Sequence, residues 1–569
     1  MVMDLESTKI GQNQYPLLIN GRNRYGIIEP IRLPKKITEG LPATGLYQGL
    51  YASDKWMLLF IAGKAYVKDF TTNLPFWQVA GFQMSTTAPV IYACPVSAAT
   101  VLFKRQLTTG SNKDVTLTSG ISGSPTCIIC QDGENQPWII QSDGSARITQ
   151  TYDEWQLEGP TLPNNHQEYV PIGKQMIYTG GILYLAAKDE SERYTQIFRS
   201  VSGRPLDFMV NIDSAGNKQP TEELGGAAQV SNRVSSEEIT GMIASDVSVG
   251  GFIVYTLKSS TMVIPDFVNT IFNEPKFTNI PVLMTGAKNQ FSIVNIDGAT
   301  AFIGQDSGID GFNAVQQYRL EGNAKTFSSP VSGLFKLPGE QRSILQSTCC
   351  SHATNSYVFF SMDTIYGPAV VVYDTFLDCF VCIDRYWNDT TTKIKQFAEL
   401  KLNGQEFVYF ITNTNELFEI FEGTAYATCT LYSGEYCSQD PKIGQKPQFI
   451  NLCFTNIYDQ GNVSVELFVD QISIVSKSHT LVNTIDIPTV PIPIPFPYFQ
   501  SPKSKALSYP FLQDSRTGWK SGYLISWNFN ASLSAIHAVC QDDSSNITFQ
   551  QQVTINNQYV PQATTPIYQ

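Results

Sequence analysis

The sequence is poor in charge, in histidine and in long apolar runs. Charged residues make up 15% of the 569 residues, against roughly 25% in average soluble proteins, and there are 4 histidines. Ser, Thr, Asn, Gln and Gly take the place of the missing charge. An uncharged polar surface of this kind suits permanent contacts between subunits.

Signals for secretion and for membrane insertion are also missing. Residues 1–15 contain neither the basic region nor the apolar core of a secretory signal. The longest apolar stretches, such as residues 56–62, are far shorter than a membrane-spanning helix. The 11 cysteines are odd in number and lie mostly in apolar runs, which favours reduced, buried thiols over a disulfide framework. We therefore expect a protein without a membrane span that matures in a cytoplasm.

The net charge of −12 argues against a basic surface that binds nucleic acid, because such binding depends on positive charge and counterion release. Two interpretations of the acidity stay open. It keeps the particle soluble, or it provides a mildly repulsive wall around DNA that is enclosed without being held.

Glycine, proline and aromatic residues are plentiful, with 40 Gly, 31 Pro, 27 Tyr and 33 Phe. Frequent Gly and Pro leave no room for long helices, and the aromatic residues fit pleated surfaces. A recurring unit consists of an apolar run, a turn with Gly or Asp, and a second apolar run. Its first copy, residues 56–67, predicts a tight hairpin. Further copies begin near residues 127, 176, 241, 291, 357 and 407. The fold class is therefore predicted to be all-β.

The spacing of these strand clusters, about 40 to 60 residues, favours a β-propeller, whose blades are small antiparallel sheets around an axis. A pair of stacked sandwiches is the competing architecture. We expect an extended N-terminal arm over residues 1–45, the propeller over 46–423 and a separate antiparallel β-domain over 424–569. In the last domain the longer alternating strands indicate one buried and one exposed face.

A proline-rich insertion at about residues 475–508 interrupts the C-terminal domain. Residues 485–499 contain five prolines, of which the last four alternate with apolar residues, and proline cannot donate to the ladder of a central strand. The segment is therefore expected to be extended and stiff. A rigid apolar protrusion requires a partner surface. The candidate contact residues are Ile492, Pro493, Ile494, Pro495, Phe496 and Tyr498.

Two C-x-x-C pairs, Cys127/Cys130 and Cys379/Cys382, are the first candidates for a metal site. Each pair lies in a strand-like run, where residues three apart point to opposite faces. Buried structural thiols are therefore favoured over zinc ligands. Cys349, Cys350 and His352 match no thiol-protease signature.

The acidic side chains form no catalytic pattern either. Glu222-Glu223 and Glu237-Glu238 lie in polar, loop-like sequence and are interpreted as solvated surface. Residues 306–311 lack the bidentate Glu of a calcium loop, and the Asp143-Gly144 turn lacks the spacing of a sialidase Asp-box. We predict no catalytic, metal or cofactor site.

The order of several motifs resembles the tail hub or nozzle proteins of short-tailed, podovirus-like bacteriophages, a family also called packaged-DNA stabilisation proteins. The motifs lie at residues 18–21, 31–34, 197–205, 239–242, 252–261, 298–303 and 370–374. Each motif is weak, and their order carries the resemblance, which covers roughly residues 15–555. The proline-rich insertion has no counterpart in the family pattern.

The resemblance implies a homo-oligomeric ring in the virion tail, usually a hexamer, which lies below the portal and adaptor. Such a ring prolongs the DNA channel, retains the packaged genome and conducts it during ejection, without sequence-specific DNA binding or catalytic residues. Under this hypothesis Ile492, Ile494, Phe496 and Tyr498 contact a neighbouring subunit or narrow the channel, whereas the alternative is that they pack on their own subunit.

Two other functions compete with a structural virion protein. One is a glycan-binding or glycan-depolymerising propeller used in host recognition, which would need two carboxylates across a cleft. The other is an intracellular propeller scaffold.

Overall fold

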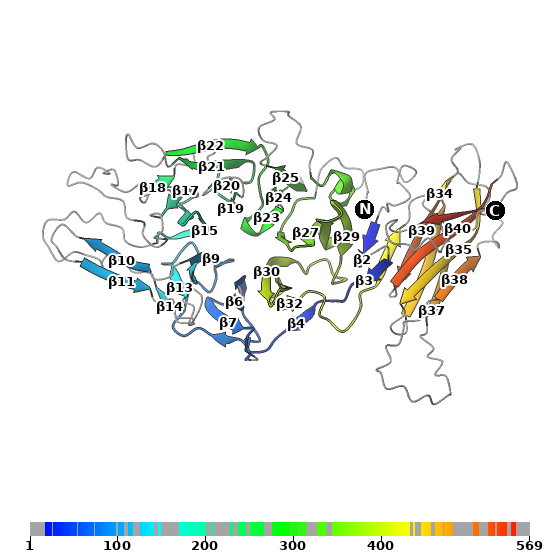
Figure 1. Cartoon of the computed structure of the whole chain (residues 1–569), viewed down its shortest axis with the longest axis horizontal. Helices are drawn as coiled ribbons and strands as arrows, with labels where there is room; N and C mark the ends of the chain where they lie inside the picture. The colour runs from blue at the N-terminus through cyan, green and yellow to red at the C-terminus, as the bar shows by residue number, and fades with distance from the viewer. Residues whose placement is uncertain are drawn as a thin grey trace.

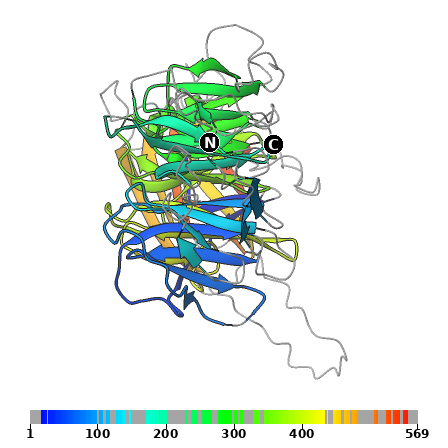
Figure 2. The same ribbon diagram turned by 90° about the vertical axis from the view of Figure 1, so that its left-hand side faces the viewer.

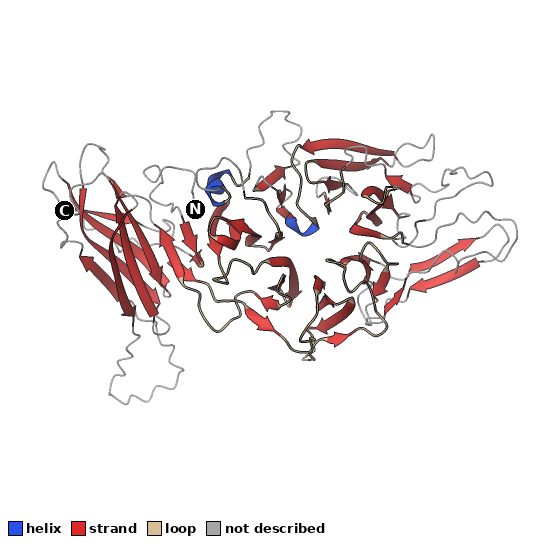
Figure 3. Cartoon of the chain, turned by 180° about the vertical axis from the view of Figure 1, so that it is seen from behind, coloured by secondary structure: helices blue, strands red, loops and turns tan. Residues whose placement is uncertain are grey.

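The computed structural model describes residues between 17 and 553, with gaps of which the longest are 149–169, 209–227, 314–326, 482–504 and 511–521. Strands dominate, and the helices in the described part are two short 3-10 helices, η3 (Gln290–Ser292) and η5 (Ser329–Leu334) (Figure 3). The chain forms a seven-bladed β-propeller followed by an antiparallel β-domain (Figure 1). The predicted fold class is therefore confirmed, and the sandwich alternative is wrong.

The first four blades each consist of four antiparallel strands that are arranged around the propeller axis. Blade 1 contains β5 (Tyr47–Ser53), β6 (Trp56–Ile61), β7 (Lys64–Asp69) and β8 (Trp77–Gln78), and blade 2 contains β9 (Tyr92–Ser97), β12 (Thr126–Gln131), β13 (Trp138–Ile140) and β14 (Ala146–Ile148). Blade 3 contains β15 (Gly173–Thr179), β16 (Ile182–Lys188), β17 (Tyr194–Arg199) and β18 (Ala228–Val230), and blade 4 contains β19 (Gly241–Ala244), β20 (Phe252–Tyr255), β21 (Ser260–Asp266) and β22 (Lys276–Leu283). A ribbon of β10 (Val101–Gln106) and β11 (Asn112–Leu117) is inserted in blade 2.

The last three blades complete the circle. Blade 5 contains β23 (Ile293–Ile296), β24 (Ala299–Ile303) and β25 (Ile309–Asn313), and blade 6 contains β26 (Cys350–Ala353), β27 (Tyr357–Thr364), β28 (Gly367–Asp374) and β29 (Cys379–Asp384). Blade 7 contains β30 (Ile394–Leu402), β31 (Gln405–Thr412) and β32 (Leu417–Glu419), and its outer strand is β4 (Lys35–Ile37) from the start of the chain. The first and last parts of the propeller are therefore joined in one sheet.

The core lies between the blades. Strand β6 has the continuous apolar sequence WMLLFI and is buried at all six positions. Met57, Leu59 and Ile61 pack in one hydrophobic cluster with residues of blade 7. Trp56, Leu58 and Phe60 pack in another cluster with residues of blade 2. The run does not alternate between apolar and polar residues because a neighbouring blade covers each face of the sheet.

The hairpin between β6 and β7 shows how the turns fix the blades. Ala62 and Gly63 both have positive φ values, of 49° and 77°, as a type I′ hairpin turn requires. The Gly63 amide donates to Gln48 Oε1 at 2.6 Å. A Cβ atom at Gly63 would lie 2.4 Å from the carbonyl oxygen of Met84. Glycine is therefore required at position 63 by the backbone conformation. It is also required by the close approach of Met84, which lies in the segment that connects blade 1 to blade 2.

The C-terminal domain contains two sheets of strands that are not consecutive in the chain. The first, β33 (Cys429–Tyr432), β39 (Gly522–Phe529), β36 (Gly461–Val469) and β37 (Ile472–Leu481), carries β34 (Tyr436–Cys437) on β39. The second contains β40 (Ser532–Asp542), β35 (Gln445–Asn456) and β38 (Lys505–Pro510), with β41 (Thr548–Val553) on β40. In Figure 2 this domain lies behind the propeller, whose blades are seen from the side.

Residues near the start of the chain belong to both domains. β1 (Leu17–Ile19) lies between β29 of blade 6 and β33 of the C-terminal domain. β2 (Gly21–Arg24) and β3 (Ile27–Pro30) form a hairpin that extends the second C-terminal sheet through β40. The segment expected as an extended arm thus supplies strands to three sheets, which the sequence did not indicate.

Candidate functional site

A cavity lies at the propeller axis, where the inner parts of the blades meet. It has a volume of about 220 Å³, which is room for a handful of water molecules at roughly 30 Å³ each. The lining residues come from six of the seven blades and are Tyr51, Tyr92, Ala93, Met176, Gln290, Phe291, Ile293, Ser351, Gln396 and Phe397.

Aromatic rings narrow this cavity. Phe291 stacks on Tyr92, with ring centroids 6.0 Å apart and an interplanar angle of 12°, and it lies 6.5 Å from the ring of Tyr51. The Tyr51 hydroxyl donates to the carbonyl oxygen of Ile91 at 2.8 Å. Burial raises the pKa of Tyr51 well above its usual value. The hydroxyl therefore stays protonated and serves as a structural donor.

The backbone around Phe291 is fixed by a capping box. Asn289 Oδ1 accepts from the amides of Phe291 and Ser292 at 2.8 and 3.0 Å, and the Ser292 hydroxyl accepts from the Asn289 amide at 3.1 Å. Asn289 Nδ2 also donates to the carbonyl oxygen of Cys349 at the start of blade 6. The ring at the axis is thus held by contacts to two blades.

Two glutamines at the axis each bind the inner strand of a neighbouring blade through the oxygen and the nitrogen of the side-chain amide. Gln290 accepts from the Met242 amide and donates to the Met242 carbonyl, both at 2.8 Å. Gln396 accepts from the Leu50 amide at 3.0 Å and also donates to the Leu50 carbonyl. Innermost strands have one unpaired edge, and these side chains satisfy its backbone groups. They connect blade 5 to blade 4 and blade 7 to blade 1.

The axis of one propeller is therefore closed by rings and paired amides. A space of about 220 Å³ cannot pass a polymer as wide as duplex DNA, whose major groove alone is about 12 Å wide. Among the described residues, the side chains at the axis connect neighbouring blades and leave a cavity of this size between them.

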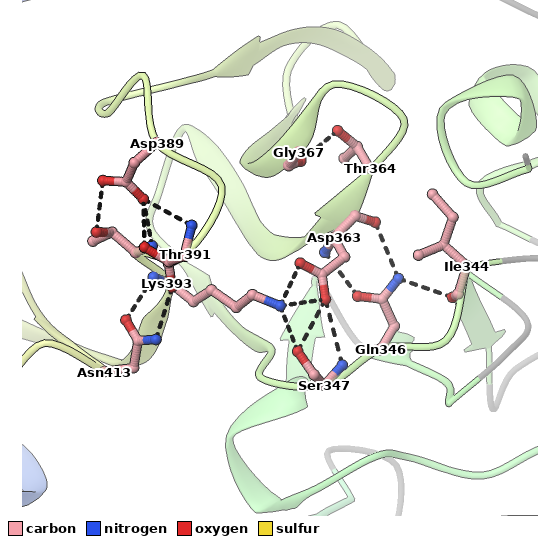
Figure 4. A network of polar contacts seen from close by, with 11 residues as sticks. Ile344, Gln346, Ser347, Asp363, Thr364, Gly367, Asp389, Thr391, Lys393 and Asn413 are labelled. Atoms are coloured by element: carbon pink, nitrogen blue, oxygen red, sulfur yellow. Dashed lines mark hydrogen bonds and ion pairs between the residues drawn. The ribbon is translucent and has the colours of Figure 1, made fainter.

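A second polar cluster connects blades 6 and 7 (Figure 4). Lys393 Nζ lies 2.7 Å from Asp363 Oδ1 and donates to Ser347 Oγ at 2.5 Å. Gln346 accepts from the Asp363 amide at 2.8 Å and donates to its carbonyl oxygen at 3.1 Å. Asn413 accepts from the Lys393 amide at 2.8 Å. The cluster thus joins the linker before β26, the end of β27, the start of β30 and the turn after β31.

The Ser347–Lys393 contact has the composition of a Ser–Lys nucleophilic pair, but its geometry does not suit that chemistry. A lysine that activates a serine must be neutral to accept the proton. The Asp363 carboxylate contacts Lys393 Nζ through both of its oxygens, at 2.7 and 2.8 Å, so this nitrogen is engaged in an ion pair between the two blades. We interpret the cluster as a structural contact between two blades.

The two C-x-x-C pairs do not converge on a metal. Cys127 and Cys130 pack in different hydrophobic clusters on opposite faces of β12, as the strand period predicts. Cys382 is buried whereas Cys379 is exposed, so the prediction of a buried thiol is wrong for Cys379. No group of three or more His, Cys, Asp and Glu side chains in the described residues could hold a metal ion.

The cysteines near His352 are buried thiols. Burial raises the pKa of Cys349 to about 12 and that of Cys350 well above its usual value. A Cys–His nucleophile needs the thiolate, which burial of these two cysteines disfavours. His352 Nε2 instead lies 3.5 Å from Glu399 Oε2 on the neighbouring blade.

The structure also locates one of the acidic pairs from the sequence. Glu237 lies 3.0 Å from Lys258 and accepts from the Thr256 hydroxyl at 3.1 Å, so it contacts the turn between β20 and β21. Residues 222–223 lie outside the described residues.

The predicted contact residues Ile492, Pro493, Ile494, Pro495, Phe496 and Tyr498 also lie outside the described residues. Strands β37 and β38 occupy the two ends of the 475–508 segment. No helix in the described part of the chain has the length and apolar character needed to cross a bilayer.

Sequence reasoning missed the axial glutamines. They have no local signature, because each acts on a backbone group far away in the chain. The only available signal was the unusual abundance of uncharged polar residues in strand-rich sequence.

No protein-family model and no curated protein sequence matches the chain. Among solved structures, Raptor from Chaetomium thermophilum is similar with a TM-score of 0.38 and 10% identity over 70% of this chain, which spans 29% of Raptor. The propeller of Dos1 is similar with a TM-score of 0.32 and 11% identity over 70% of this chain and 97% of that propeller. These likenesses are distant, so the assignment of the fold rests on the sheets described above.

Proposed function

We propose that the chain is a structural subunit of a virion tail, the hub or nozzle ring of a short-tailed bacteriophage. In this role several copies form a closed ring that extends the channel of the portal and adaptor, retains the packaged genome and conducts it during ejection. The role requires no catalytic group and no cofactor.

The observation that carries the proposal is the order of the family-like motifs along the chain. Residues 197–199 lie in β17 of blade 3, residues 252–255 in β20 of blade 4, residues 299–303 in β24 of blade 5 and residues 370–374 in β28 of blade 6. The motifs therefore lie on strands of four consecutive blades.

The lining of the propeller axis supports a ring of several chains over a single conducting chain. Aromatic rings and glutamine amides surround a cavity of about 220 Å³ there, which favours a DNA channel enclosed by several subunits. A net charge of −12 suits a wall along which DNA slides without adhering, because negative potential opposes the phosphates.

Exposed apolar side chains support association with partners. Phe376 is 88% exposed and Leu377 is 41% exposed in the turn between β28 and β29. Asp374 Oδ1 accepts from both of their amides at 2.9 Å, and the Thr375 hydroxyl donates to the carbonyl oxygens of Asn355 and Ser356 at 3.2 and 3.1 Å. An exposed aromatic side chain on a turn that is fixed by hydrogen bonds is typical of a surface that contacts another protein.

Native mass measurement of the purified full chain across a range of concentrations tests the proposal, together with negative-stain microscopy. The expected result is a closed oligomer of fixed copy number with a central opening. A chain that stays monomeric at every concentration and releases sugar from host polysaccharide would instead support the glycan-active alternative. A monomer without that activity would also contradict the proposal.

A further inference from the structure

The segment of residues 17–37, called here the N-terminal clasp, connects structures that are far apart in the sequence. It contains β1, β2, β3 and β4, which pair with four different parts of the chain. β1 pairs with blade 6 and with the C-terminal domain, β3 pairs with β40, and β4 closes blade 7. Four connections therefore depend on one short piece of chain.

A buried ion pair anchors the clasp to the propeller. Arg22 in β2 binds Asp384 at the end of β29 through both of its terminal nitrogens, at 2.7 Å to Oδ1 and 2.5 Å to Oδ2. The two side chains are 4% and 0% exposed. The Arg22 guanidinium also lies 5.5 Å from the ring of Tyr357 and 5.2 Å from that of Phe421. A bidentate, stacked arginine is the strongest form of such a contact.

Asn20 adds a contact to each domain from a single side chain. Its Oδ1 accepts from the Arg385 amide of the propeller at 2.6 Å, and its Nδ2 donates to the Thr428 carbonyl beside β33 at 3.2 Å. Asn20 has a φ of 56°, a left-handed conformation that Asn tolerates better than most residues. The residue thus turns the chain between β1 and β2 while it bridges the two domains.

Backbone hydrogen bonds attach the clasp to the segment that joins the propeller to the C-terminal domain. The Leu33 amide donates to the Ala425 carbonyl and the Gly423 amide donates to the Leu33 carbonyl, both at 2.9 Å. The Ala427 amide donates to the Ile31 carbonyl at 2.8 Å. A Cβ atom at Gly423 would lie 2.2 Å from the Leu33 oxygen, so this close approach requires glycine.

The strand that closes the propeller has few strong contacts of its own. β4 has three residues, of which Lys35 and Lys36 are exposed. Its ion pair, Lys36–Glu416 at 2.5 Å, has side chains that are 51% and 30% exposed, and an exposed pair contributes little. The exposed side chains of β4 thus add little, and the strand is held by its pairing with β32, by Ile37 on the core cluster and by the clasp that precedes it.

We propose that the N-terminal clasp is a conformational latch, in which release of Arg22 from Asp384 opens the closure of blade 7 and the junction between the domains in one event. The coupling follows from connectivity, because β1 and β4 lie on either side of the anchor and the same clasp residues pair with the interdomain segment. The inference does not depend on the proposed tail function.

Hydrogen exchange of the full chain tests the latch with the Arg22→Met variant, which leaves the buried Asp384 carboxylate without its cationic partner. Removing one partner of a buried pair is strongly destabilising, so amide exchange should rise on the order of a hundredfold or more in the opened unit. The rise is expected together in β4 with its partner β32 and in β1 with its partner β33, while β20 in blade 4 stays protected. The matched control Lys36→Met, which removes the exposed pair, should change exchange by less than about fivefold.

A graded variant keeps the test decisive if Arg22→Met does not fold. Arg22→Lys retains the charge and loses the bidentate geometry, and it should raise exchange in the same two places by a smaller factor. A rise confined to β33 with β32 unchanged would overturn the latch, because the two connections would then be independent. Unchanged exchange at both places would overturn it as well.

Discussion

The interior of the propeller and its outer turns use polar and apolar residues in opposite ways. At the axis, Gln290 and Gln396 are committed to backbone groups of neighbouring blades. On the outer surface, Phe376 is 88% exposed and Met284 is 91% exposed. The axial glutamines are thus used by backbone groups of neighbouring blades, whereas Phe376 and Met284 are apolar side chains that no described residue covers. The difference indicates that the inside holds the blades together and the outside is available to partners.

The largest expected effect separates a buried phenylalanine from an exposed one. Phe410 has 0% exposure, and its ring lies 5.4 Å from that of Phe418 and 5.8 Å from that of Tyr386. Phe410→Ala should lower the free energy of unfolding by about 3–5 kcal/mol, because it removes a large side chain and leaves a cavity. Denaturant unfolding measures this, with Phe376→Ala as the matched control, for which a change within about 0.5 kcal/mol is expected. Equal effects would remove the contrast between inside and outside.

The axial glutamines should have the next largest effect. Gln396→Leu leaves the amide and carbonyl of Leu50 without their partner, and a buried unsatisfied group costs about 1–3 kcal/mol. The same free energy of unfolding, measured for Gln396→Leu and for the exposed Gln78→Leu in β8, separates the paired amide from a surface amide. A neutral effect at Gln396 would mean that the amide contributes nothing at the axis.

Alkaline pH should weaken the interior. Burial raises the pKa of Cys94 to about 12, whereas an unfolded thiol titrates near about 8.5. Between these values the unfolded chain loses a proton that the folded chain keeps, so stability is present below pH 8.5 and falls as the pH rises towards 12. Thermal unfolding at stepped pH values above 8 should show a fall that is smaller in Cys94→Ala. The same slope in both proteins would assign the effect to other groups.

Much of the propeller could be predicted from sequence because each blade is built from neighbouring strands. The hairpin at residues 56–67 was predicted from two apolar runs and a turn, and it is found as β6 and β7. The closing strand β4 could not be predicted in the same way. It pairs Ile37 with Leu417, and no local pattern specifies a contact across almost the whole propeller.

Among the candidate sites, too, features set by neighbouring residues were predicted and contacts between distant residues were missed. The opposite orientation of Cys127 and Cys130 was predicted from the period of a strand and is confirmed. The anchor between Arg22 and Asp384 was missed, because a single arginine in a short polar strand gives no signal of its distant partner. The direction of a side chain in a strand can be predicted from neighbouring residues. A contact between residues that are far apart in the sequence cannot.

The smallest expected change in stability accompanies a large change in assembly. Phe376→Ser should leave the free energy of unfolding within about 0.5 kcal/mol of the parent, because the side chain is 88% exposed and the turn keeps its hydrogen bonds to Asp374. If the turn contacts a neighbouring subunit, the same variant should shift the native mass from oligomer to smaller species. An unchanged oligomer would exclude Phe376 from that contact.

The position of DNA relative to the propeller tests the proposed tail function most directly. Cryo-electron microscopy of DNA-filled phage particles assembled with this chain as the proposed tail component can measure it. The expected result is a ring of several copies with DNA density on the central axis of the ring, while the axis of each propeller is closed by Phe291 and its neighbours. DNA density through the axis of a single propeller, or the absence of a ring, would contradict the account.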